Sequence, residues 1–540
     1  MTRTLFIGID GATFDVLDDL CADAPGRGVV MPFLKRFMES GFRAVLRSTP
    51  LPLTPPAWTS MTTGKGPGHH GIFDFMRSED KGNEVFFTLY DFRDIRTETV
   101  WSIASRQDRQ VVSLNFPMTA PPPKINGSVI PGFTSWRHMR RNSHPGDLFD
   151  RLAERIEGLS PKALAWDFEK ENEVGEEMAE DHLADWIAYH LPREQQWARV
   201  ASALLQEDRP DLLGVMFDGT DKIQHQAWHC IDPTLRPTPP YSDGFAKVYD
   251  LCLEYFRGLD RYIEGLVGLA GDDAQVFLAS DHGFTATSEV VRINRYLADK
   301  GYLTYHDVAD TDSARRRANS PFAFLDWDRT TAYCPTPSSN GIRIRVRRQP
   351  GDPGIAPEHY QAFRARLIAD LRELRSPATG APVVRDILLR EEAFPGRATD
   401  DAPDLTLELG DHGFVSIRNL EPPVVPRNYP AGTHHPDGIF IAGGAGMVAG
   451  VRDDRLEIAD VAATLLYSLG LPVPEDFEGH VALNCFTAEY VRANPVVRGP
   501  ATLPVGSRGQ STDADSGDDV ADAEKQKIVD QLVMLGYLEE

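Results

Sequence analysis

The 540-residue chain lacks several features that would assign it to particular protein classes. It has only five cysteines, which are scattered, odd in number and without a Cys-x-x-Cys pair. This pattern disfavours a disulfide framework and is typical of reduced thiols in a cytosol. No stretch approaches the ~20 consecutive apolar residues of a membrane span, and the apolar run near the N-terminus is too short for a signal peptide. We therefore expect a cytoplasmic protein that does not associate with membranes.

Positive charge is also scarce. The chain has 56 Lys and Arg residues against 80 Asp and Glu residues, a formal net charge of −24. Such a charge repels the phosphates of nucleic acids and of anionic membranes, so we expect neither a nucleic acid polymer nor a membrane as a partner. A local basic pocket for a small anion is still compatible with this balance.

Short apolar runs alternate with helical periodicity along the chain. The runs at residues 5–9, 110–114, 212–217, 275–279 and 439–442 are apolar on both faces, as in the central strands of a parallel sheet. Helical patterns lie between them, for example at 249–270 and 458–469. This alternation predicts an α/β fold with a doubly wound, mostly parallel sheet flanked by helices.

The domain organisation follows from changes in composition. We predict one α/β catalytic domain over residues 1–490 with two insertions, a helical and highly charged segment at about 140–200 and a cap over the site at about 300–390. Residues 495–523 are rich in Gly, Ser, Asp and Pro, which predicts a disordered acidic linker. A short amphipathic helix is predicted over residues 524–540.

Acidic and histidine side chains follow several of these strands. Asp10 comes directly after the first apolar run, and Asp281 and His282 follow the run at 275–279 through one serine. In open α/β sheets the carboxyl ends of the strands are where sites form. His434 lies in a glycine- and proline-containing loop before the last run, which suits the rigid presentation of one imidazole.

Asp221 and His225 are four residues apart in a predicted helix. At this spacing both side chains share one helix face and can hold one ion. A lone pair of this kind is common by chance, and Asp218, directly after a strand, is an alternative ligand. The Asp-His-Gly-Phe sequence of Asp281 recurs at residues 411–414, and we favour the first copy because a cleaner buried strand precedes it.

Thr54 begins the sequence Thr-Pro-Pro-Ala-Trp, a well-marked helix start. Thr54 suits the N-cap, Pro55 the first helical position and Gly64 the end of the helix, so a plain capping threonine is the simplest interpretation. The alternative is a nucleophile. A helix N-terminus favours negative charge by only about 0.3–1 kcal/mol, so a threonine alkoxide would also need a metal ion. Three aspartates and this alkoxide carry four negative charges, which two divalent cations would neutralise.

The order and spacing of these motifs resemble the alkaline phosphatase superfamily, and most of all its type I phosphodiesterase/nucleotide pyrophosphatase family. The resemblance runs from Thr4 to about Gly479. The segments that carry it are Gly-Ile-Asp-Gly at 8–11, Thr54 with Thr-Gly at 63–64 and Pro-Gly-His-His-Gly at 67–71, Asp-x-x-x-His at 221–225, Ser-Asp-His-Gly at 280–283 and Gly-Thr-His at 432–434.

The resemblance implies a two-metal site with defined ligands. By this resemblance Asp221, His225 and His434 would hold one divalent ion, usually zinc in this family, with manganese as the alternative. A second ion would be held by Asp10, Asp281 and His282. Thr54 would touch the second ion and act as the nucleophile, giving a phospho-threonine intermediate that water then hydrolyses.

The implied activity is hydrolysis of a small phosphate ester, most of all a phosphodiester such as a nucleotide derivative. A phosphomonoesterase or phosphomutase on the same scaffold is the alternative, and a catalytically silent binding protein is a third interpretation. No Lys or Arg lies between Thr54 and Lys65, which favours the singly charged diester. Pro55 has no N–H to offer to the phosphate, so Lys222 and Asn115 are candidate donors.

Overall fold

A computed structural model of the chain describes residues 4–81, 84–166, 180–306, 322, 324–450 and 454–505. The chain divides into two compact units. Within the described residues, unit 1 comprises 4–72, 90–284 and 434–505, and unit 2 comprises 73–89 and 285–433. The predicted helical insertion at 140–200 falls in unit 1, and the predicted cap at 300–390 falls in unit 2.

Unit 1 is built around an eight-stranded sheet with the order β17-β2-β16-β8-β1-β7-β5-β6. The pairs β17–β2, β8–β1, β1–β7, β7–β5 and β5–β6 are parallel, which confirms the predicted mostly parallel sheet. The strands are β1 (Thr4–Ile9), β2 (Phe42–Arg47), β5 (Val111–Leu114), β6 (Gly127–Ile130), β7 (Leu212–Phe217), β8 (Gln275–Ala279), β16 (Asp437–Gly444) and β17 (Asp454–Glu457).

The direction of β16 was predicted wrongly. We expected residues 439–442 to lie in a parallel strand, but β16 is antiparallel to both of its neighbours, β2 and β8. The strand lies in the interior of the sheet, and residues 439–442 are fully buried. Burial on both faces demands apolar side chains whichever way the strand runs, so an apolar run does not report its direction.

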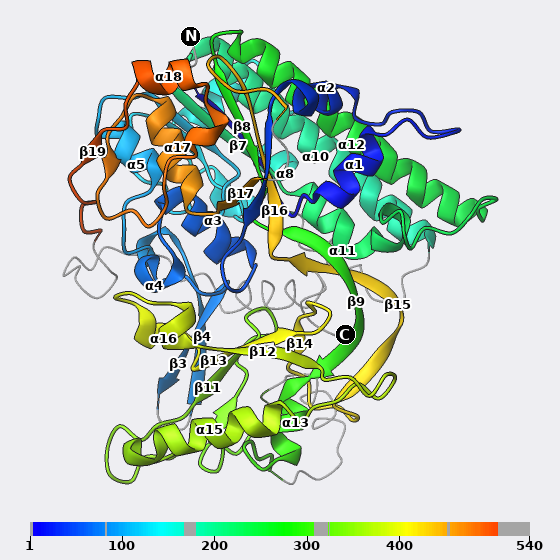
Figure 1. Cartoon of the computed structure of the whole chain (residues 1–540), viewed down its shortest axis with the longest axis vertical. Helices are drawn as coiled ribbons and strands as arrows, with labels where there is room; N and C mark the ends of the chain where they lie inside the picture. The colour runs from blue at the N-terminus through cyan, green and yellow to red at the C-terminus, as the bar shows by residue number, and fades with distance from the viewer. Residues whose placement is uncertain are drawn as a thin grey trace. The chain divides into compact units, whose positions relative to one another are not determined.

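Helices cover both faces of this sheet (Figure 1). The helices α1, α2, α10 and α12 lie on one side, and α3, α5 and α17 lie on the other. The predicted helices at 249–270 and 458–469 are confirmed within α12 and α17. The helices of unit 1 are α1 (Phe14–Cys21), α2 (Pro32–Ser40), α3 (Thr54–Thr63), α4 (Pro67–His70), α5 (Val100–Ser105), α6 (Trp136–Met139), α7 (Leu148–Ala153), α8 (Pro161–Leu164), α10 (Glu180–Glu207), α11 (Gly219–Ile231), α12 (Asp243–Ala270), α17 (Asp460–Ser468) and α18 (Ala488–Ala493).

Two glycines let tryptophan rings pack directly on the sheet. A Cβ atom at Gly8 in β1 would lie 2.5 Å from Cη2 of Trp58 in α3, and a Cβ at Gly214 in β7 would lie 2.4 Å from Cη2 of Trp101 in α5. Both tryptophans belong to the large apolar core on this face. Gly8 therefore sets how closely α3, the helix that carries Thr54, approaches the central strand β1, and Gly214 does the same for α5 and β7.

Unit 2 contains smaller sheets. One has the order β10-β11-β13-β12 and is antiparallel throughout, and the others have the orders β14-β9-β15 and β3-β4. The elements are β3 (Met76–Lys81), β4 (Glu84–Leu89), β9 (Gly283–Arg292), α13 (Ile293–Asp299), β10 (Ala332–Tyr333), β11 (Gly341–Ile344), α15 (Tyr360–Leu371), β12 (Val384–Leu389), α16 (Arg390–Ala393), β13 (Leu405–Leu409), β14 (Val415–Ser416) and β15 (Val424–His435).

The predicted linker at 495–523 begins with ordered structure. Strand β19 (Arg498–Gly499) pairs with β18 (Val473–Pro474), and the Thr502 N–H donates to Asp476 Oδ1 at 2.8 Å. Composition alone predicted disorder here because it does not report these pairings of the backbone. The rest of that segment and the predicted helix at 524–540 lie outside the described residues.

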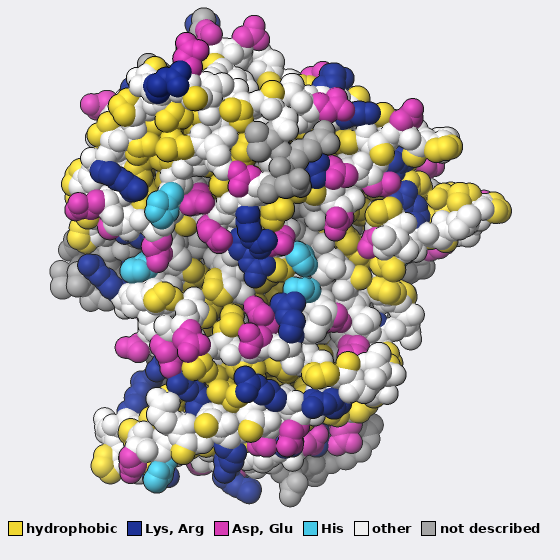
Figure 2. Space-filling view, in the orientation of Figure 1, with side chains coloured by type: hydrophobic (Ala, Val, Ile, Leu, Met, Phe, Trp, Pro, Cys, Tyr) yellow, Lys and Arg dark blue, Asp and Glu magenta, His cyan; other side chains and the backbone are white. Residues whose placement is uncertain are grey.

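Charged side chains of both signs are interspersed on the face shown in Figure 2. The net charge of −24 is therefore not gathered into one acidic area on this face. Among the described helices, none combines the length and the apolar character needed to cross a membrane.

Candidate active site

The predicted site residues lie at the carboxyl edge of the unit 1 sheet. The parallel neighbours β1, β7 and β8 end at the same edge. Asp10 directly follows β1, Asp281 follows β8 after one residue, and α11 begins one residue after β7. Residues that are far apart in the sequence therefore come together here. All seven predicted site residues belong to unit 1, and all are buried.

Asp221, His225 and His434 form one group. Asp221 and His225 lie one turn apart on α11, and His434 lies near the end of β15. Oδ1 of Asp221 is 3.2 Å from Nε2 of His434 and 3.5 Å from Nε2 of His225. The two Nε2 atoms are 3.0 Å apart. Three potential metal-ligand atoms, one carboxylate oxygen and two imidazole nitrogens, thus converge in one small volume.

Asp10, Asp281 and His282 form a second group. Nε2 of His282 lies 3.2 Å from Oδ2 of Asp281 and 3.6 Å from Oδ1 of Asp10. The Gly11 N–H donates to the other oxygen of Asp281 at 3.2 Å, and the indole N–H of Trp58 donates to the other oxygen of Asp10 at 3.4 Å. One oxygen of each carboxylate is held by the protein, and the second lies near His282.

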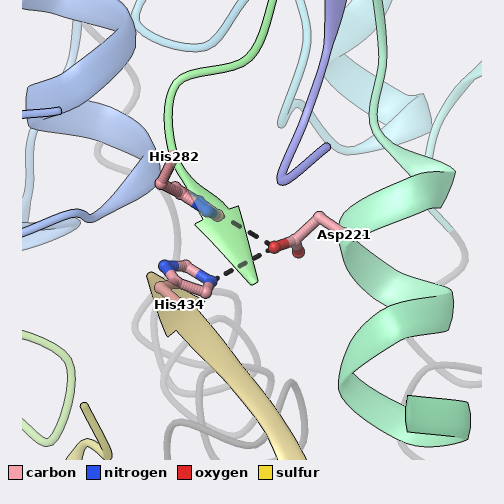
Figure 3. A group of neighbouring side chains, drawn as sticks. All are labelled: Asp221, His282 and His434. Carbon is pink, nitrogen blue, oxygen red and sulfur yellow. Dashed lines mark ion pairs between the residues drawn. The ribbon is translucent and has the colours of Figure 1, made fainter. Parts of the chain in front are cut away.

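His282 joins the two groups. Its Nε2 is 3.9 Å from Oδ1 of Asp221, and its ring stacks on His434 with ring centroids 3.5 Å apart and planes 20° apart. Figure 3 shows both imidazoles beside the Asp221 carboxylate. Two sets of three ligand atoms, Asp10-Asp281-His282 and Asp221-His282-His434, share this histidine. The cluster is therefore continuous rather than two separate sites.

The imidazoles of His434 and His282 turn their lone pairs toward the cluster. Nδ1 of His434 lies 2.7 Å from the Pro52 carbonyl oxygen, and Nδ1 of His282 lies 3.1 Å from that of Gly283. A carbonyl oxygen only accepts, so each Nδ1 carries the proton and each Nε2 is left with a lone pair. Histidines that bind metals are commonly oriented by this kind of hydrogen bond.

Three carboxylate oxygens in the cluster lack a donor. Oδ1 of Asp10, Oδ1 of Asp221 and Oδ2 of Asp281 are buried and have no hydrogen-bond partner within the described parts of the chain. Burying a carboxylate oxygen without a partner is costly, and a bound cation removes the cost. Carboxylate oxygens combined with neutral imidazole nitrogens are a donor set that fits divalent ions such as zinc or manganese.

The pKa shifts in the cluster also favour a bound cation. Burial, reinforced by the charges of Asp281 and Asp221, raises the pKa of Asp10 well above its ordinary value, and burial also raises the pKa of Asp281. Burial lowers the pKa of His282 and brings the pKa of His434 to about 3. These two histidines are therefore neutral at pH 7, the form in which an imidazole can bind a metal. Cations here would restore the ionised carboxylates that burial disfavours.

Thr54 is not the N-cap that the sequence predicted. The N-cap of α3 is Leu53, and Thr54 is the first helical residue. As a cap, Thr54 would bind the N–H of Pro56 or Ala57, but proline has no N–H and the Ala57 N–H donates to the Leu53 carbonyl oxygen at 3.0 Å. The hydroxyl of Thr54 is thus released from capping, and its Oγ1 lies 3.4 Å from Nε2 of His282. Gly64 ends the helix with φ 67°, as predicted.

Asp218, the alternative ligand, is engaged elsewhere. Its carboxylate binds both Nη atoms of Arg193, with Nη2 at 3.1 Å, and accepts the indole N–H of Trp166 at 2.6 Å. The candidate phosphate donors belong to the same surroundings. Nδ2 of Asn115 donates to a backbone carbonyl at 2.9 Å, and Nζ of Lys222 lies 3.8 Å from the ring centroid of Trp166. Sequence reasoning missed Arg193 and Trp166 because neither carries a motif.

The second Asp-His-Gly-Phe copy belongs to unit 2. Asp411 accepts the Thr287 hydroxyl at 2.8 Å and the Ser288 N–H at 2.9 Å, so this carboxylate organises a backbone turn. Nε2 of His412 lies 3.1 Å from Nη1 of Arg385. Among the described residues, the metal-ligand groups include the copy at 281–282 and not the copy at 411–412.

The sheet, its flanking helices and the cluster at its carboxyl edge place the chain in the alkaline phosphatase superfamily. The family model "Type I phosphodiesterase / nucleotide pyrophosphatase" matches residues 4–437, and the chain belongs to this family. It is therefore a hydrolase that acts on phosphoric ester bonds, in a family that generally depends on two metals. No curated protein matches the chain in sequence.

Solved structures resemble the chain over most of its length. Human ectonucleotide pyrophosphatase/phosphodiesterase 5 is 12% identical, with 91% of this chain and 99% of that chain covered and a TM-score of 0.50, which shows a shared fold. The phosphonoacetate hydrolase of Sinorhizobium meliloti 1021, solved with phosphonoformate, is 17% identical, with 87% and 95% covered and a TM-score of 0.48.

Proposed function

We propose that this hydrolase is a two-metal phosphodiesterase that cleaves nucleotides or other small phosphodiesters through a phospho-threonine intermediate. One observation carries the proposal. Seven side chains from distant parts of the sequence meet in one buried cluster, and three of its carboxylate oxygens have no partner among the described residues. The family supports the reaction class.

In this proposal Asp221, His225 and His434 hold one ion, and Asp10, Asp281 and His282 hold the other. Zinc is the proposed metal and manganese the alternative, since both accept oxygen and nitrogen ligands. When bound, such ions stabilise charge on the phosphate oxygens and favour the ionised form of a nearby hydroxyl. The protein supplies a buried site in which neutral imidazoles and carboxylates are already oriented.

Thr54 is the proposed nucleophile. Its hydroxyl is buried, released from helix capping and 3.4 Å from a proposed metal-ligand atom, Nε2 of His282. In the first step Oγ1 bonds to phosphorus and the Thr54 proton passes to solvent. One ester oxygen leaves with its bonding electrons and takes up a proton, while the second ester group stays on the phosphorus. In the second step water attacks the same phosphorus and loses a proton, and Oγ1 leaves with its bonding electrons and takes up a proton to restore the threonine.

The lack of a free cationic side chain close to Thr54 in the sequence favours a diester over a monoester as the substrate. A monoester carries about one more negative charge at neutral pH and should need a further cation. The first cation along the chain after Thr54 is Lys65, and its ammonium is bound to Asp476 and, at 2.8 Å, to the Thr502 hydroxyl. Helix α3 therefore brings no uncommitted positive charge to the phosphate.

The test compares hydrolysis of bis-p-nitrophenyl phosphate with hydrolysis of p-nitrophenyl phosphate by metal-stripped protein to which zinc or manganese is added. Faster, metal-dependent cleavage of the diester is expected. Preference for the monoester would move the assignment to a phosphomonoesterase or phosphomutase. Two bound metals without hydrolysis of either ester would indicate a narrow substrate range, and no bound metal would refute the proposed centre.

We also propose that the protein works in the cytoplasm. All five cysteines are buried free thiols, as expected in a reducing compartment. Cell fractionation with an antibody against the chain tests this, and recovery from outside the cytoplasm would contradict it.

A further inference from the structure

The start of α11, the helix that carries Asp221 and His225, is held by buried polar side chains outside the proposed metal centre. Asp218 is the N-cap residue, but its side chain makes no capping hydrogen bond to α11. Its carboxylate instead accepts from both Nη atoms of Arg193, from the indole of Trp166 at 2.6 Å and from Nδ2 of Asn115 at 3.4 Å. Both of its oxygens are therefore committed.

A second contact from the same helix reinforces this one. Oε1 of Glu194, the next residue on α10, accepts the N–H of Gly219, the first residue of α11, at 3.3 Å. The same oxygen lies 3.3 Å from Nη1 of Arg193. Adjacent residues of α10 thus bind both the cap side chain and the first backbone donor of α11.

Arg193 and Trp166, which bind Asp218, have further partners of their own. Nε of Arg193 donates to the Leu164 carbonyl oxygen at 3.0 Å, and the Lys222 ammonium lies 3.8 Å from the centroid of the Trp166 ring that binds Asp218. Arg193, Glu194, Asp218 and Lys222 are all buried. Charged side chains in such surroundings persist only with well-formed partners, so the geometry is tightly specified.

We propose that Arg193 is a positioning residue of the metal centre: its paired hydrogen bonds to Asp218 fix the first turn of α11 and so hold Asp221 and His225 ready for a metal ion. This inference rests on the proposed metal centre. Asp221 is the third residue of α11, so rotation or fraying of the first turn moves its carboxylate directly. Held in advance, the two ligands lose little freedom when the ion binds.

The test uses Arg193→Lys, which keeps the positive charge but not the planar two-pronged donor. The matched control is Arg151→Lys. Arg151 binds Asp208 through two hydrogen bonds of 3.1 Å and ties α7 to the residue after α10, away from α11. In case Arg193→Lys does not fold, the double variant Arg193→Gln with Asp218→Asn removes both members of this ion pair together, so that neither is left buried without the other.

Calorimetric titration of each metal-stripped protein with zinc is the main readout, and far-UV circular dichroism and thermal unfolding without metal report the fold. The affinity of one of two zinc sites is expected to fall roughly 10-fold or more in Arg193→Lys and in the double variant, while Arg151→Lys binds like the wild type. Equal affinities in all folded variants would overturn the positioning role. A wild type that binds no zinc would overturn the metal centre and this inference together.

Discussion

Asp74 offers a sharp test of how burial controls ionisation in unit 2. Its carboxylate is buried and accepts the hydroxyl groups of Thr336 and Ser338, the latter at 2.7 Å, and the N–H of Phe75 at 2.6 Å. Burial raises the pKa of Asp74 to about 6, although these hydrogen bonds and Arg343 act in the opposite direction. The substitution Asp74→Asn keeps the shape and an acceptor but removes the titration.

The sign and size of the effect follow from the two pKa values. The reference pKa for the unfolded chain is 3.8, so folding raises it by about two units. A raised pKa contributes stability below the unfolded value, and this stability is lost as the pH rises through the folded value. The gap corresponds to about 3 kcal/mol. Between pH 4 and pH 7, wild type should therefore lose roughly 2–3 kcal/mol of stability relative to Asp74→Asn.

The assay is urea unfolding of both proteins at several pH values from 4 to 7. A brief hydrogen-exchange pulse at each urea concentration, read by mass spectrometry of unit 2 peptides, reports that unit alone. The difference between the two proteins isolates Asp74, because they share every other titrating group. A stability difference that is independent of pH, or that moves in favour of wild type as the pH rises, would show that Asp74 does not titrate with a raised pKa in the folded protein.

Three further predictions concern the site and its support. Thr54→Ala should lower metal-dependent diester hydrolysis by roughly 10³-fold or more with metal content unchanged, and steady-state rates near wild type would exclude it as the nucleophile. His225→Ala and His434→Ala should each reduce tightly bound metal in elemental analysis whereas His412→Ala should not, and metal loss in the His412 variant would mean that the wrong motif copy was chosen. Gly8→Ala should cost about 1–3 kcal/mol, because its Cβ would lie 2.5 Å from a tryptophan ring, and an unchanged urea midpoint would contradict this packing.

The central strands of the sheet could be predicted from the sequence because such strands must be apolar on both faces. Residues 5–9, 212–217 and 275–279 showed this pattern and occupy the middle of the sheet. The direction of β16 was not readable, since the same burial applies to a strand of either direction. The order at 495–505 was equally hidden, because backbone pairing with β18 leaves no trace in composition.

Site residues that closely follow strands, such as Asp10 and Asp281, could be predicted from the sequence. The role of Arg193 could not be predicted, because a buried arginine in a charged helix has the same sequence pattern as an exposed one. The N-cap assignment of Thr54 failed for a local reason. Pro56 has no N–H for a capping hydroxyl of Thr54 to bind, and the Ala57 N–H is taken by the Leu53 carbonyl oxygen, so the helix begins one residue earlier than predicted.

The two-metal phosphodiesterase proposal is tested by trapping the covalent intermediate in which Thr54 is bonded to the phosphorus of the substrate. Metal-loaded protein is mixed with a ³²P-labelled diester, quenched in acid within the first turnover and digested for mass spectrometry. One phosphate that still carries the second ester group of the substrate is expected on the peptide that contains Thr54, and it should be absent from Thr54→Ala and from metal-stripped protein. Rapid metal-dependent turnover with label on another residue, or with no covalent label at all, would contradict it.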